Sequence, residues 1–370
     1  MRLYARVLPG LEALCAEEVS GLLRAERVET GKGRVEFGCP LPQPGLRSLL
    51  VCDSLCLLVR RSEGDFGGRG GLTALRAKLA RTDFDRHLAR WAQPGLPAVA
   101  SFRVRAVVGK GCEFAFFDVV REATAILARR LDLPPAETGA PLVVDLECSP
   151  TDLHIGLALP LPDWTDAPRR AAARSLAGAL VRLARPAPQL AVCDPDCGSG
   201  ELLRAWALAA RRPRLLGLTL GRRSDAGRDG PPCAAASPRA WPVGAGRLSR
   251  VLSLLPRIND PAQLAHLLDE LTRCLAVGGR AVFATALTGA WRTAVEALPR
   301  LTLERSLRVQ DGDRRVDVIV LTRSPDARTH ATSTTAGARA RATKDLADRL
   351  GKRRSLRARR GGKPAKRDPT

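Results

Sequence analysis

Aromatic, acidic and histidine residues are all scarce in this 370-residue chain. Phe, Trp and Tyr together make up 4% of it, and there are four His. The 38 Asp and Glu are outnumbered by 60 Lys and Arg, which gives a formal net charge of +22. The low aromatic content and the excess of Arg over Lys are typical of a GC-rich genome, and part of the charge has that origin. A surplus this large still raises the local concentration of polyanions, so nucleic acid is the favoured partner.

Long apolar runs are also missing. Glu12, Glu17 and Glu18 interrupt the amino-terminal stretch, where a secretory signal peptide would need an unbroken apolar segment. No later run approaches the roughly 20 apolar residues of a membrane-spanning helix. We therefore expect a cytoplasmic protein with no membrane partner.

Cysteine pairs at the Cys-x-x-Cys spacing are absent. The ten cysteines include no Cys-x-x-Cys motif, and ligands at that spacing hold many structural zinc ions, so no metal site is expected. In a reducing compartment the cysteines are most simply buried thiols. Cys193 and Cys197 fit small packed residues better than ligands, and no base that could activate a catalytic thiol is identified.

The first 162 residues alternate short strands with amphipathic helices. We divide them into two α+β units, residues 1–60 and 61–162. The expected strands are 2–7, a hairpin over 28–37, 56–61, 101–108 and a hairpin over 142–159, and the expected helices are 11–23, 45–55, 72–81, 84–92 and 116–131.

Residues 170–325 have the pattern of an α/β domain. Strands alternate with helices, which implies parallel strands joined by crossovers, and Asp311-Gly312-Asp313 turns the last two strands into an antiparallel hairpin. Apolar periodicity fades beyond this domain, and residues 352–370 carry nine Lys and Arg against one acid, Asp368. We expect residues 326–370 to be a disordered basic tail, either an RNA-binding arm, which we favour, or a solvated tail.

A glycine-rich corner interrupts the α/β pattern. Asp-Pro-Asp-Cys-Gly-Ser-Gly, residues 194–200, follows an apolar run and precedes a helical pattern. At the carboxyl end of a parallel strand, small residues let backbone N–H groups approach a ligand without a clash at Cβ. Asp194 can accept hydrogen bonds from a ligand ammonium or hydroxyl group. No Lys follows the glycines, which excludes a P-loop. A tight turn that needs glycine for its geometry alone remains the alternative.

Two resemblances occur in the expected order. The elements of residues 1–162, with phrases such as VLPGLEALCAEEV and SFRVRAVV, resemble a THUMP domain and its ferredoxin-like companion, an RNA-binding module of tRNA- and rRNA-modifying enzymes. The segments SLAGALVRLA, AVCDPDCGSGELLRAWAL and CLAVGGRAVFATA resemble the catalytic domain of class I methyltransferases that carry a THUMP domain.

The resemblance implies a Rossmann-like domain, with a mostly parallel sheet and a closing antiparallel hairpin, that binds S-adenosylmethionine. In the family the glycine corner begins the cofactor pocket, and Gly278-Gly279 lies at the turn before a central strand. The implied cofactor-binding residues are Asp194, Cys197, Gly198, Ser199, Gly200 and Thr219.

The cofactor contacts depart from the family in two places. The second strand of the family ends in an acid that binds both ribose hydroxyls. Here Thr219 holds that place, and the next acid is Asp225. A later Asp usually contacts the adenine amino group, but the corresponding stretch, CAAASPRAWPVG, contains no acid.

The catalytic motif is altered as well. The family supplies Asn or Asp, then Leu or Pro, then Pro and an aromatic residue, whereas this chain has SLLPR at residues 253–257. Pro256 is retained, but Leu254 cannot accept a hydrogen bond from an exocyclic amine. Ser253 has an oxygen one position early, and Arg257 could stack on a base by its guanidinium plane. Ser253 and Pro256 are therefore the catalytic candidates.

We predict an S-adenosylmethionine-dependent RNA methyltransferase that acts on a guanine exocyclic amine in tRNA or rRNA. The alternative is a catalytically inactive RNA-binding protein on a decayed methyltransferase scaffold. DNA methylation is disfavoured because the amino-terminal part resembles an RNA reader. His154, in an expected strand, and Trp164, beside the linker between the domains, are expected to be structural residues.

Overall fold

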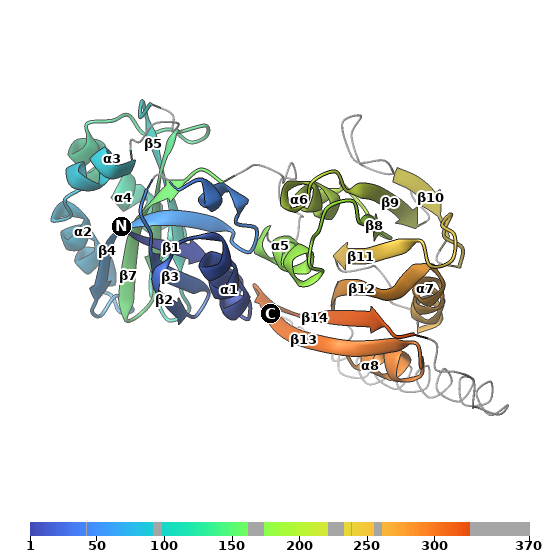
Figure 1. Ribbon diagram of the computed structural model, residues 1–370. Helices are drawn as coiled ribbons and strands as arrows, with labels where there is room; N and C mark the ends of the chain where they lie inside the picture. Colours follow the sequence, from blue (N-terminus) through green and yellow to red (C-terminus); the bar gives the residue numbers. More distant parts are fainter. Residues whose placement is uncertain are drawn as a thin grey trace, which may run out of the picture. The chain divides into compact units, whose positions relative to one another are not determined.

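The structure is a computed structural model, which describes residues 1–41, 43–91, 98–161, 174–220, 233–237, 239–254, 261–286 and 288–325. The chain divides into two compact units, one of Met1–Asp163 with Ala173–Ser175 and one of Trp164–Ala172 with Leu176–Thr370 (Figure 1). The predicted basic tail and several residues singled out from the sequence lie outside the described residues, namely Trp164, Asp225, Pro256 and Arg257.

The first unit is built on one seven-stranded sheet in the order β2-β3-β1-β4-β7-β6-β5. β5 and β6 run parallel, and the other neighbouring strands run antiparallel. The strands are β1 (Arg2–Arg6), β2 (Glu26–Gly31), β3 (Arg34–Gly38), β4 (Ser54–Glu63), β5 (Phe102–Val108), β6 (Leu142–Cys148) and β7 (Asp152–Leu159). The boundary expected between residues 60 and 61 falls inside β4, which pairs with β1 on one side and β7 on the other. The two expected parts therefore share one sheet.

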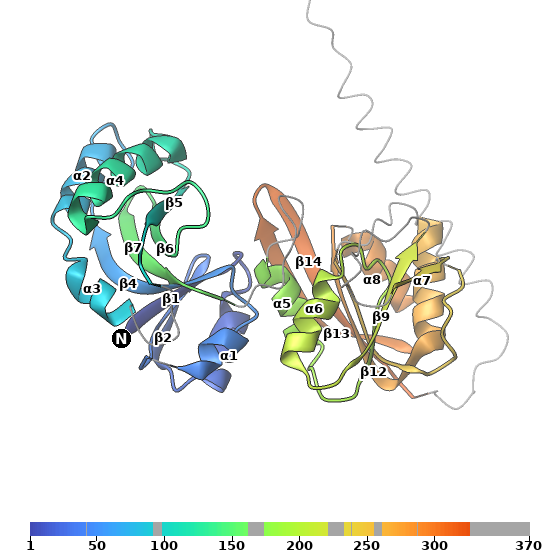
Figure 2. The ribbon, with the colours of Figure 1, turned by 90° about the horizontal axis from the view of Figure 1, so that it is seen from above.

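Helices cover the apolar face of this sheet. They are α1 (Glu12–Leu22), α2 (Gly71–Ala80), α3 (Asp85–Trp91) and α4 (Phe116–Leu131). Side chains alternate across each strand, so Leu3 and Ala5 of β1 are buried on one face while Tyr4 and Arg6 lie on the other. Figure 2 shows α2, α3 and α4 together on one side of the strands.

The helix expected over residues 45–55 is instead a single 3₁₀ turn, Pro44–Ser48. The carboxylate of Glu18, from α1, accepts the backbone N–H groups of Leu50 and Val51 at 2.9–3.2 Å. Those two donors are therefore not available for helical hydrogen bonds, and a pattern of apolar residues cannot reveal a competing acceptor from a distant part of the sequence.

The second unit is a sheet in the order β10-β9-β8-β11-β12-β14-β13. Its strands are β8 (Ala191–Asp194), β9 (Arg214–Leu220), β10 (Cys233–Ala236), β11 (Leu248–Leu254), β12 (Leu275–Thr285), β13 (Leu301–Asp311) and β14 (Arg314–Arg323). The strands from β10 to β12 run parallel, and β13 and β14 form the closing antiparallel hairpin. The expected fold class is confirmed: an α/β protein with an α+β unit followed by a Rossmann-like domain.

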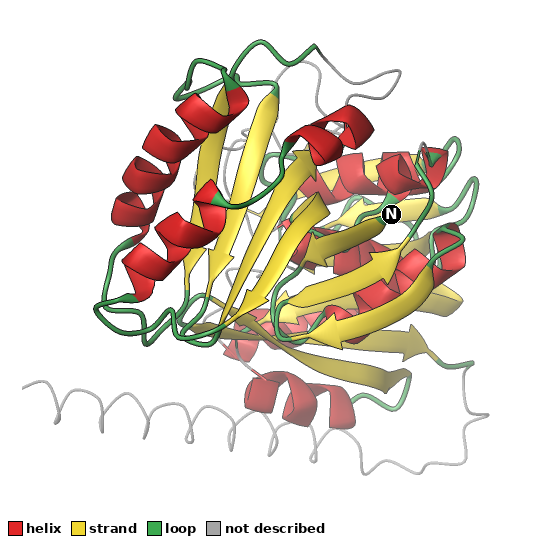
Figure 3. Ribbon diagram, turned by 90° about the vertical axis from the view of Figure 1, so that its left-hand side faces the viewer, coloured by secondary structure: helices red, strands yellow, loops and turns green. Residues whose placement is uncertain are grey.

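Helices lie on both faces of the second sheet. They are α5 (Arg174–Leu183), α6 (Glu201–Ala209), α7 (Pro261–Cys274) and α8 (Thr288–Glu296). Figure 2 shows α5 and α6 on one face of this sheet and α7 and α8 on the other, and Figure 3 colours the helices red and the strands yellow. The strand order reverses between β8 and β11, and in open α/β sheets ligands bind at the carboxyl ends of the strands at such a switch point.

Three details of the second unit differ from the expectations. β10 and α8 were not expected, because CAAA is too short and TGAWRTAVE too polar to give a clear pattern. Gly278 and Gly279 lie inside β12 and not at a turn before it. There the register with β11 shifts, and Gly278 has a φ of 73°, which favours glycine. The two glycines form an irregularity within the strand.

Candidate functional site

The glycine corner lies at the switch point of the second sheet. Asp194 ends β8, and residues 195–200 lead into α6. The N–H of Cys197 donates to the carbonyl of Leu218 in β9 at 2.9 Å, and the N–H of Gly200 donates to the carbonyl of Cys197 at 2.8 Å. These bonds fix the loop against the neighbouring strand, as a tight strand-to-helix turn requires.

The backbone of the loop is open toward solvent at its tip. Gly198 and Gly200 have φ values of 53° and 84°, a region that side chains rarely allow. A Cβ added to Gly198 would meet no atom closer than the carbonyl oxygen of Asp196 at 4.0 Å. Among the described residues, the N–H groups of Gly198 and Ser199 have no backbone acceptor. The loop therefore offers donors and space to a ligand.

Asp194 is a buried carboxylate with little compensation. It is 2% exposed and accepts a hydrogen bond from the N–H of Asp196 at 3.0 Å. No Lys, Arg or His pairs with it in the part of the chain that the structure describes. Burial raises the pKa of Asp194 to about 8, and the charge of Asp196 adds to the rise. A cationic ligand group beside Asp194 would offset the cost of burying its charge.

Thr219, at the position expected to bind the ribose, can accept fewer hydrogen bonds than the acid found there in the family that the sequence resembles. Thr219 is buried near the end of β9, and its Oγ1 lies 3.5 Å from the carbonyl oxygen of Ala234 in β10. A hydroxyl can take one ligand hydroxyl where a carboxylate takes two. Asp225, the next acid along the chain, lies outside the described residues.

An acid from a distant part of the sequence contacts the segment expected to bind the adenine, residues 233–244, and the sequence patterns did not predict it. Glu270 of α7 accepts the backbone N–H of Trp241 at 2.8 Å. Arg273 donates to both oxygens of Glu270, at 2.8 and 2.6 Å, and to the carbonyls of Val243 and Trp241. The hydrogen bond from Arg273 lowers the pKa of Glu270. Glu270 therefore holds the segment in place and is already engaged. The spacing of Glu270 and Arg273 on one helix face was the signal that could have revealed the pair.

Ser253 lies at the carboxyl end of β11 but faces the core. It is fully buried, and its Oγ has no hydrogen-bond partner among the described residues. It is in register with Phe283 of β12, whose ring packs against Trp291 of α8 at 4.8 Å between centroids. Leu254 faces the opposite side of the sheet, since successive side chains alternate. Ser253 thus lies in the layer toward α8. The other catalytic candidate, Pro256, is not described.

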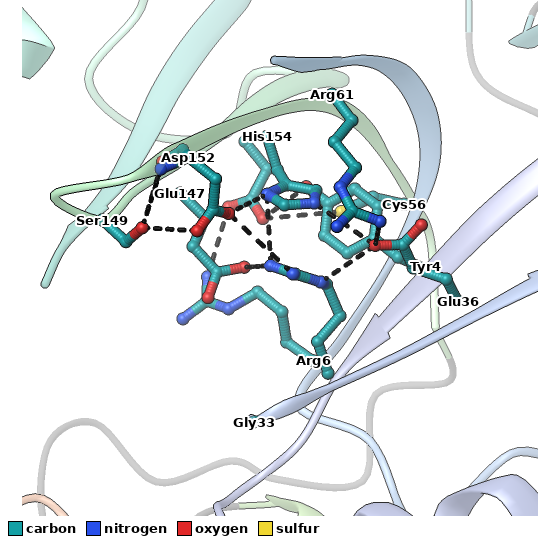
Figure 4. Close-up of polar contacts among 12 residues, drawn as sticks. Tyr4, Arg6, Gly33, Glu36, Cys56, Arg61, Glu147, Ser149, Asp152 and His154 are labelled. Atoms are coloured by element: carbon teal, nitrogen blue, oxygen red, sulfur yellow. Dashed lines mark hydrogen bonds and ion pairs between the residues drawn. The ribbon is translucent and has the colours of Figure 1, made fainter. Parts of the chain in front are cut away.

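A network of charged and polar side chains lies in the first unit (Figure 4). His154 is fully buried there, with Nε2 3.2 Å from Glu36 Oε1 and Nδ1 2.9 Å from Asp152 Oδ1. The hydrogen bond to His154 lowers the pKa of Glu36. Arg34 lies 3.2 Å from both Glu36 and His154. His154 is fully occupied by these partners, which supports the structural role expected for it.

No group of His, Cys, Asp and Glu that could hold a metal ion occurs within the described ranges. In the same ranges, no helix is both long and apolar enough to cross a membrane.

Comparison with known proteins shows a shared fold. No protein-family model matches the chain, and no curated protein has a matching sequence. Among solved structures, TrmN from Thermus thermophilus has a TM-score of 0.63 at 23% identity, and the match covers 87% of this chain and 99% of TrmN. SMU.472, described as a methyltransferase and complexed with SAH, has a TM-score of 0.58 at 13% identity, covering 88% and 99% of the two chains. An N6-adenine-specific DNA methylase from Listeria monocytogenes, so named by prediction, has a TM-score of 0.56 at 15% identity, covering 88% and 96%.

Proposed function

We propose that this protein transfers a methyl group from S-adenosylmethionine to RNA, and that the acceptor is a guanine exocyclic amine in tRNA or rRNA. The observation that carries the proposal is the corner at residues 194–200. Within the described residues, a buried carboxylate without a cationic partner, two N–H groups without a backbone acceptor and an open glycine backbone meet at the switch point of a Rossmann-like sheet. The shared fold with SMU.472, which was solved with SAH, supports the choice of ligand.

The residues of the corner fit the cofactor in part. Asp194 would accept hydrogen bonds from the cationic amino acid end of the cofactor, and the glycine loop would lie against it. Thr219 would bind one ribose hydroxyl. When bound, S-adenosylmethionine supplies an activated methyl group. Burial of Asp194 excludes water, so its interaction with a cation is stronger than it would be at the surface.

The acceptor side would depend on the end of β11. An exocyclic amine needs an oxygen that accepts its hydrogens, so that its lone pair can point toward the methyl group. Ser253 lies there, but its side chain is fully buried in the layer toward α8 and would have to turn toward the corner to accept those hydrogens. Pro256 and Arg257 would bound the base, with Arg257 stacking by its plane. Because the family's Asn or Asp is replaced by Leu254, we expect slow methyl transfer.

A non-enzymatic RNA-binding protein on the same scaffold is the second candidate. It is favoured by the segment at residues 233–244, whose sequence contains no acid. Glu270 of α7 accepts the backbone N–H of Trp241 in this segment and so holds its backbone in place. Both the methyltransferase and the non-enzymatic protein are expected to bind the cofactor weakly, so a measured cofactor affinity does not distinguish them. A test for methyl transfer does distinguish the two candidates.

The test uses S-adenosylmethionine labelled in its methyl group, the full-length protein, and unmodified tRNA and rRNA transcripts. Matched DNA oligonucleotides serve as the control for the nucleic acid. We expect label in RNA, recovered as N2-methylguanosine after digestion. Label in adenine of the DNA would overturn the choice of substrate. Binding to RNA without any label in either nucleic acid would favour the non-enzymatic protein.

A further inference from the structure

Two sulfur atoms meet beside the glycine corner. Cys197 lies in the corner and Cys233 begins β10, 36 residues later, and their Sγ atoms are 3.3 Å apart. Neither cysteine is part of a disulfide. The sequence gives no hint of this pair, because the two cysteines lie in different elements and fit no motif spacing.

Gly217 makes this approach possible. It lies opposite Cys233 in the register of β9 and β10. A Cβ at residue 217 would lie 2.5 Å from the Sγ of Cys197 and 2.6 Å from the Sγ of Cys233. Any side chain at this position would therefore push the sulfurs away. The missing side chain leaves the space in which the two thiols face each other.

We propose that Cys197 and Cys233 are a covalent modification site, at which hydrogen peroxide converts the two thiols into a disulfide that ties the glycine corner to β10. A disulfide needs the sulfurs at about 2.05 Å, so they must come closer by about 1.3 Å. The loop that carries Cys197 ends at glycines, and β10 is the edge strand of its sheet. Both sides of the pair can therefore move by this amount without breaking the central strands.

The reaction balances with one molecule of peroxide. Cys233, the more exposed of the two cysteines, gives up its proton and attacks a peroxide oxygen as the thiolate. The O–O bond breaks, the departing hydroxide takes up a proton and leaves as water, and Cys233 becomes a sulfenic acid. Cys197 then attacks the Sγ of Cys233, the S–S bond forms, and the S–O bond breaks. The hydroxide that leaves takes the proton of Cys197 and becomes a second water. Two thiols lose two electrons, and peroxide gains them.

Burial of Cys197 affects both the formation of the disulfide and its reduction. Burial is the largest cause of a raised pKa for the Cys197 thiol, and the charge of Asp194 adds to it. A thiol of high pKa is a poor leaving group, so a reductant that must expel Cys197 would react slowly. The same burial makes Cys197 a poor first target for peroxide, which leaves that role to Cys233. We expect slow formation and a bond that resists reduction.

The consequence for the pocket rests on the proposed function. Cys197 directly precedes the open loop at Gly198, and Thr219 pairs with Ala235 of β10, two residues beyond Cys233. A ligand bound across the corner and the end of β9 would cover the pair. S-adenosylhomocysteine should therefore slow the oxidation.

The test exposes the full-length protein to hydrogen peroxide, alkylates the remaining thiols and maps the peptides by mass spectrometry. We expect a peptide pair linked through Cys197 and Cys233, a loss of two of the ten titratable thiols, and recovery of both after treatment with dithiothreitol. Cys233→Ser should abolish the linked peptide, whereas Cys274→Ser, in the same unit, should leave it unchanged. Gly217→Ala should slow its formation at least tenfold, because the added methyl group separates the sulfurs. Full alkylation of Cys197 and Cys233 after peroxide would overturn the proposal.

The outcome separates this proposal from the proposed function. If the link forms equally fast with and without S-adenosylhomocysteine, and calorimetry shows no binding, the cofactor pocket fails while the modification site stands. If calorimetry shows binding but no linked peptide forms, the modification site fails while the pocket stands.

Discussion

Asp145 in the first unit and Asp194 in the second are both buried carboxylates on β-strands, and their surroundings are opposite. Asp145 is fully buried and accepts from the hydroxyl of Tyr4 at 3.1 Å, from Arg6 at 3.3 Å and from Nε of Arg105 at 2.6 Å. Asp194 accepts one hydrogen bond from within the described residues, donated by the backbone N–H of Asp196. The described residues therefore provide cationic partners for Asp145 and none for Asp194.

The difference in hydrogen-bond partners indicates which buried carboxylate stabilises the fold and which could bind a ligand. A buried charge is tolerated when the fold provides its partners, and it then fixes the packing of the elements that bring them. A buried charge without partners destabilises the fold unless something else supplies them. Perturbed carboxylates of the second kind gather at binding sites. This is why the polar network of Figure 4 is not our candidate site, although it holds far more charged groups than the glycine corner.

The largest expected effect is the loss of the compensated acid. Asp145→Ala leaves the charges of Arg6 and Arg105 without their buried partner, and breaking a buried pair from one side costs about 3–5 kcal/mol. Denaturation in urea should show this loss of unfolding free energy. Glu29→Ala, which breaks an exposed pair with Arg2, is the control and should cost less than about 1 kcal/mol. Equal costs would mean that the network of the first unit does not stabilise it.

The next largest effect should come from filling the glycine corner. Gly200 has a φ of 84°, so Gly200→Val strains the backbone and places a branched side chain where a ligand would approach. Calorimetry should find no binding of S-adenosylhomocysteine. Gly246→Val is the matched control, because Gly246 has a φ of 65° and open space around it but lies in another loop. Retained binding in Gly200→Val would remove the corner from the pocket.

A smaller effect should appear when the uncompensated acid is neutralised. Burial raises the pKa of Asp194 to about 8, so the folded chain holds this proton more tightly than the unfolded chain, whose Asp pKa is about 3.9. The free energy of unfolding of the wild type therefore falls as pH rises between these values. Asp194→Asn has no such titration and should be stabilised relative to the wild type, more at about pH 8.5 than at about pH 5. Urea denaturation of both proteins at the two pH values measures this; parallel curves would mean that Asp194 is compensated after all.

The smallest expected effect concerns the basic residues 326–370. Deleting residues 326–370 should lower RNA affinity and flatten its dependence on salt, because fewer Lys and Arg then release counterions from the phosphates. Preference for structured RNA should remain, since we expect the first unit to supply it. Filter binding at several salt concentrations measures both quantities. An unchanged slope would make the tail a solvated extension.

The sequence predicts the strands and helices that carry strong periodicity, and it predicts the glycine corner because the residue types there serve the geometry directly. It does not predict features that depend on distant partners. Glu18 replaces a helix by a turn, Glu270 holds the segment expected at the adenine, and Cys233 reaches Cys197, each across a separation that no local pattern encodes. Ser253 illustrates the same limit, because its position was predictable while the layer it faces depends on the register with Phe283. The compensation of Asp145 and its lack at Asp194 likewise follow only from the assembled sheets.

The most direct test asks whether Asp194 marks a cofactor pocket. Calorimetry would titrate the full-length wild type, Asp194→Asn and Asp225→Ala with S-adenosylhomocysteine. The sequence lacks two of the cofactor contacts that its resemblance to methyltransferases implies. Each lost hydrogen bond to a charged acceptor costs about 1.5–3 kcal/mol, so the wild type should bind weakly. Asp194→Asn should remove the binding, and Asp225→Ala should leave it unchanged. No binding by the wild type, or equal binding by Asp194→Asn, would contradict the account; tight binding lost in Asp225→Ala would place the ribose acid at Asp225 instead of Thr219.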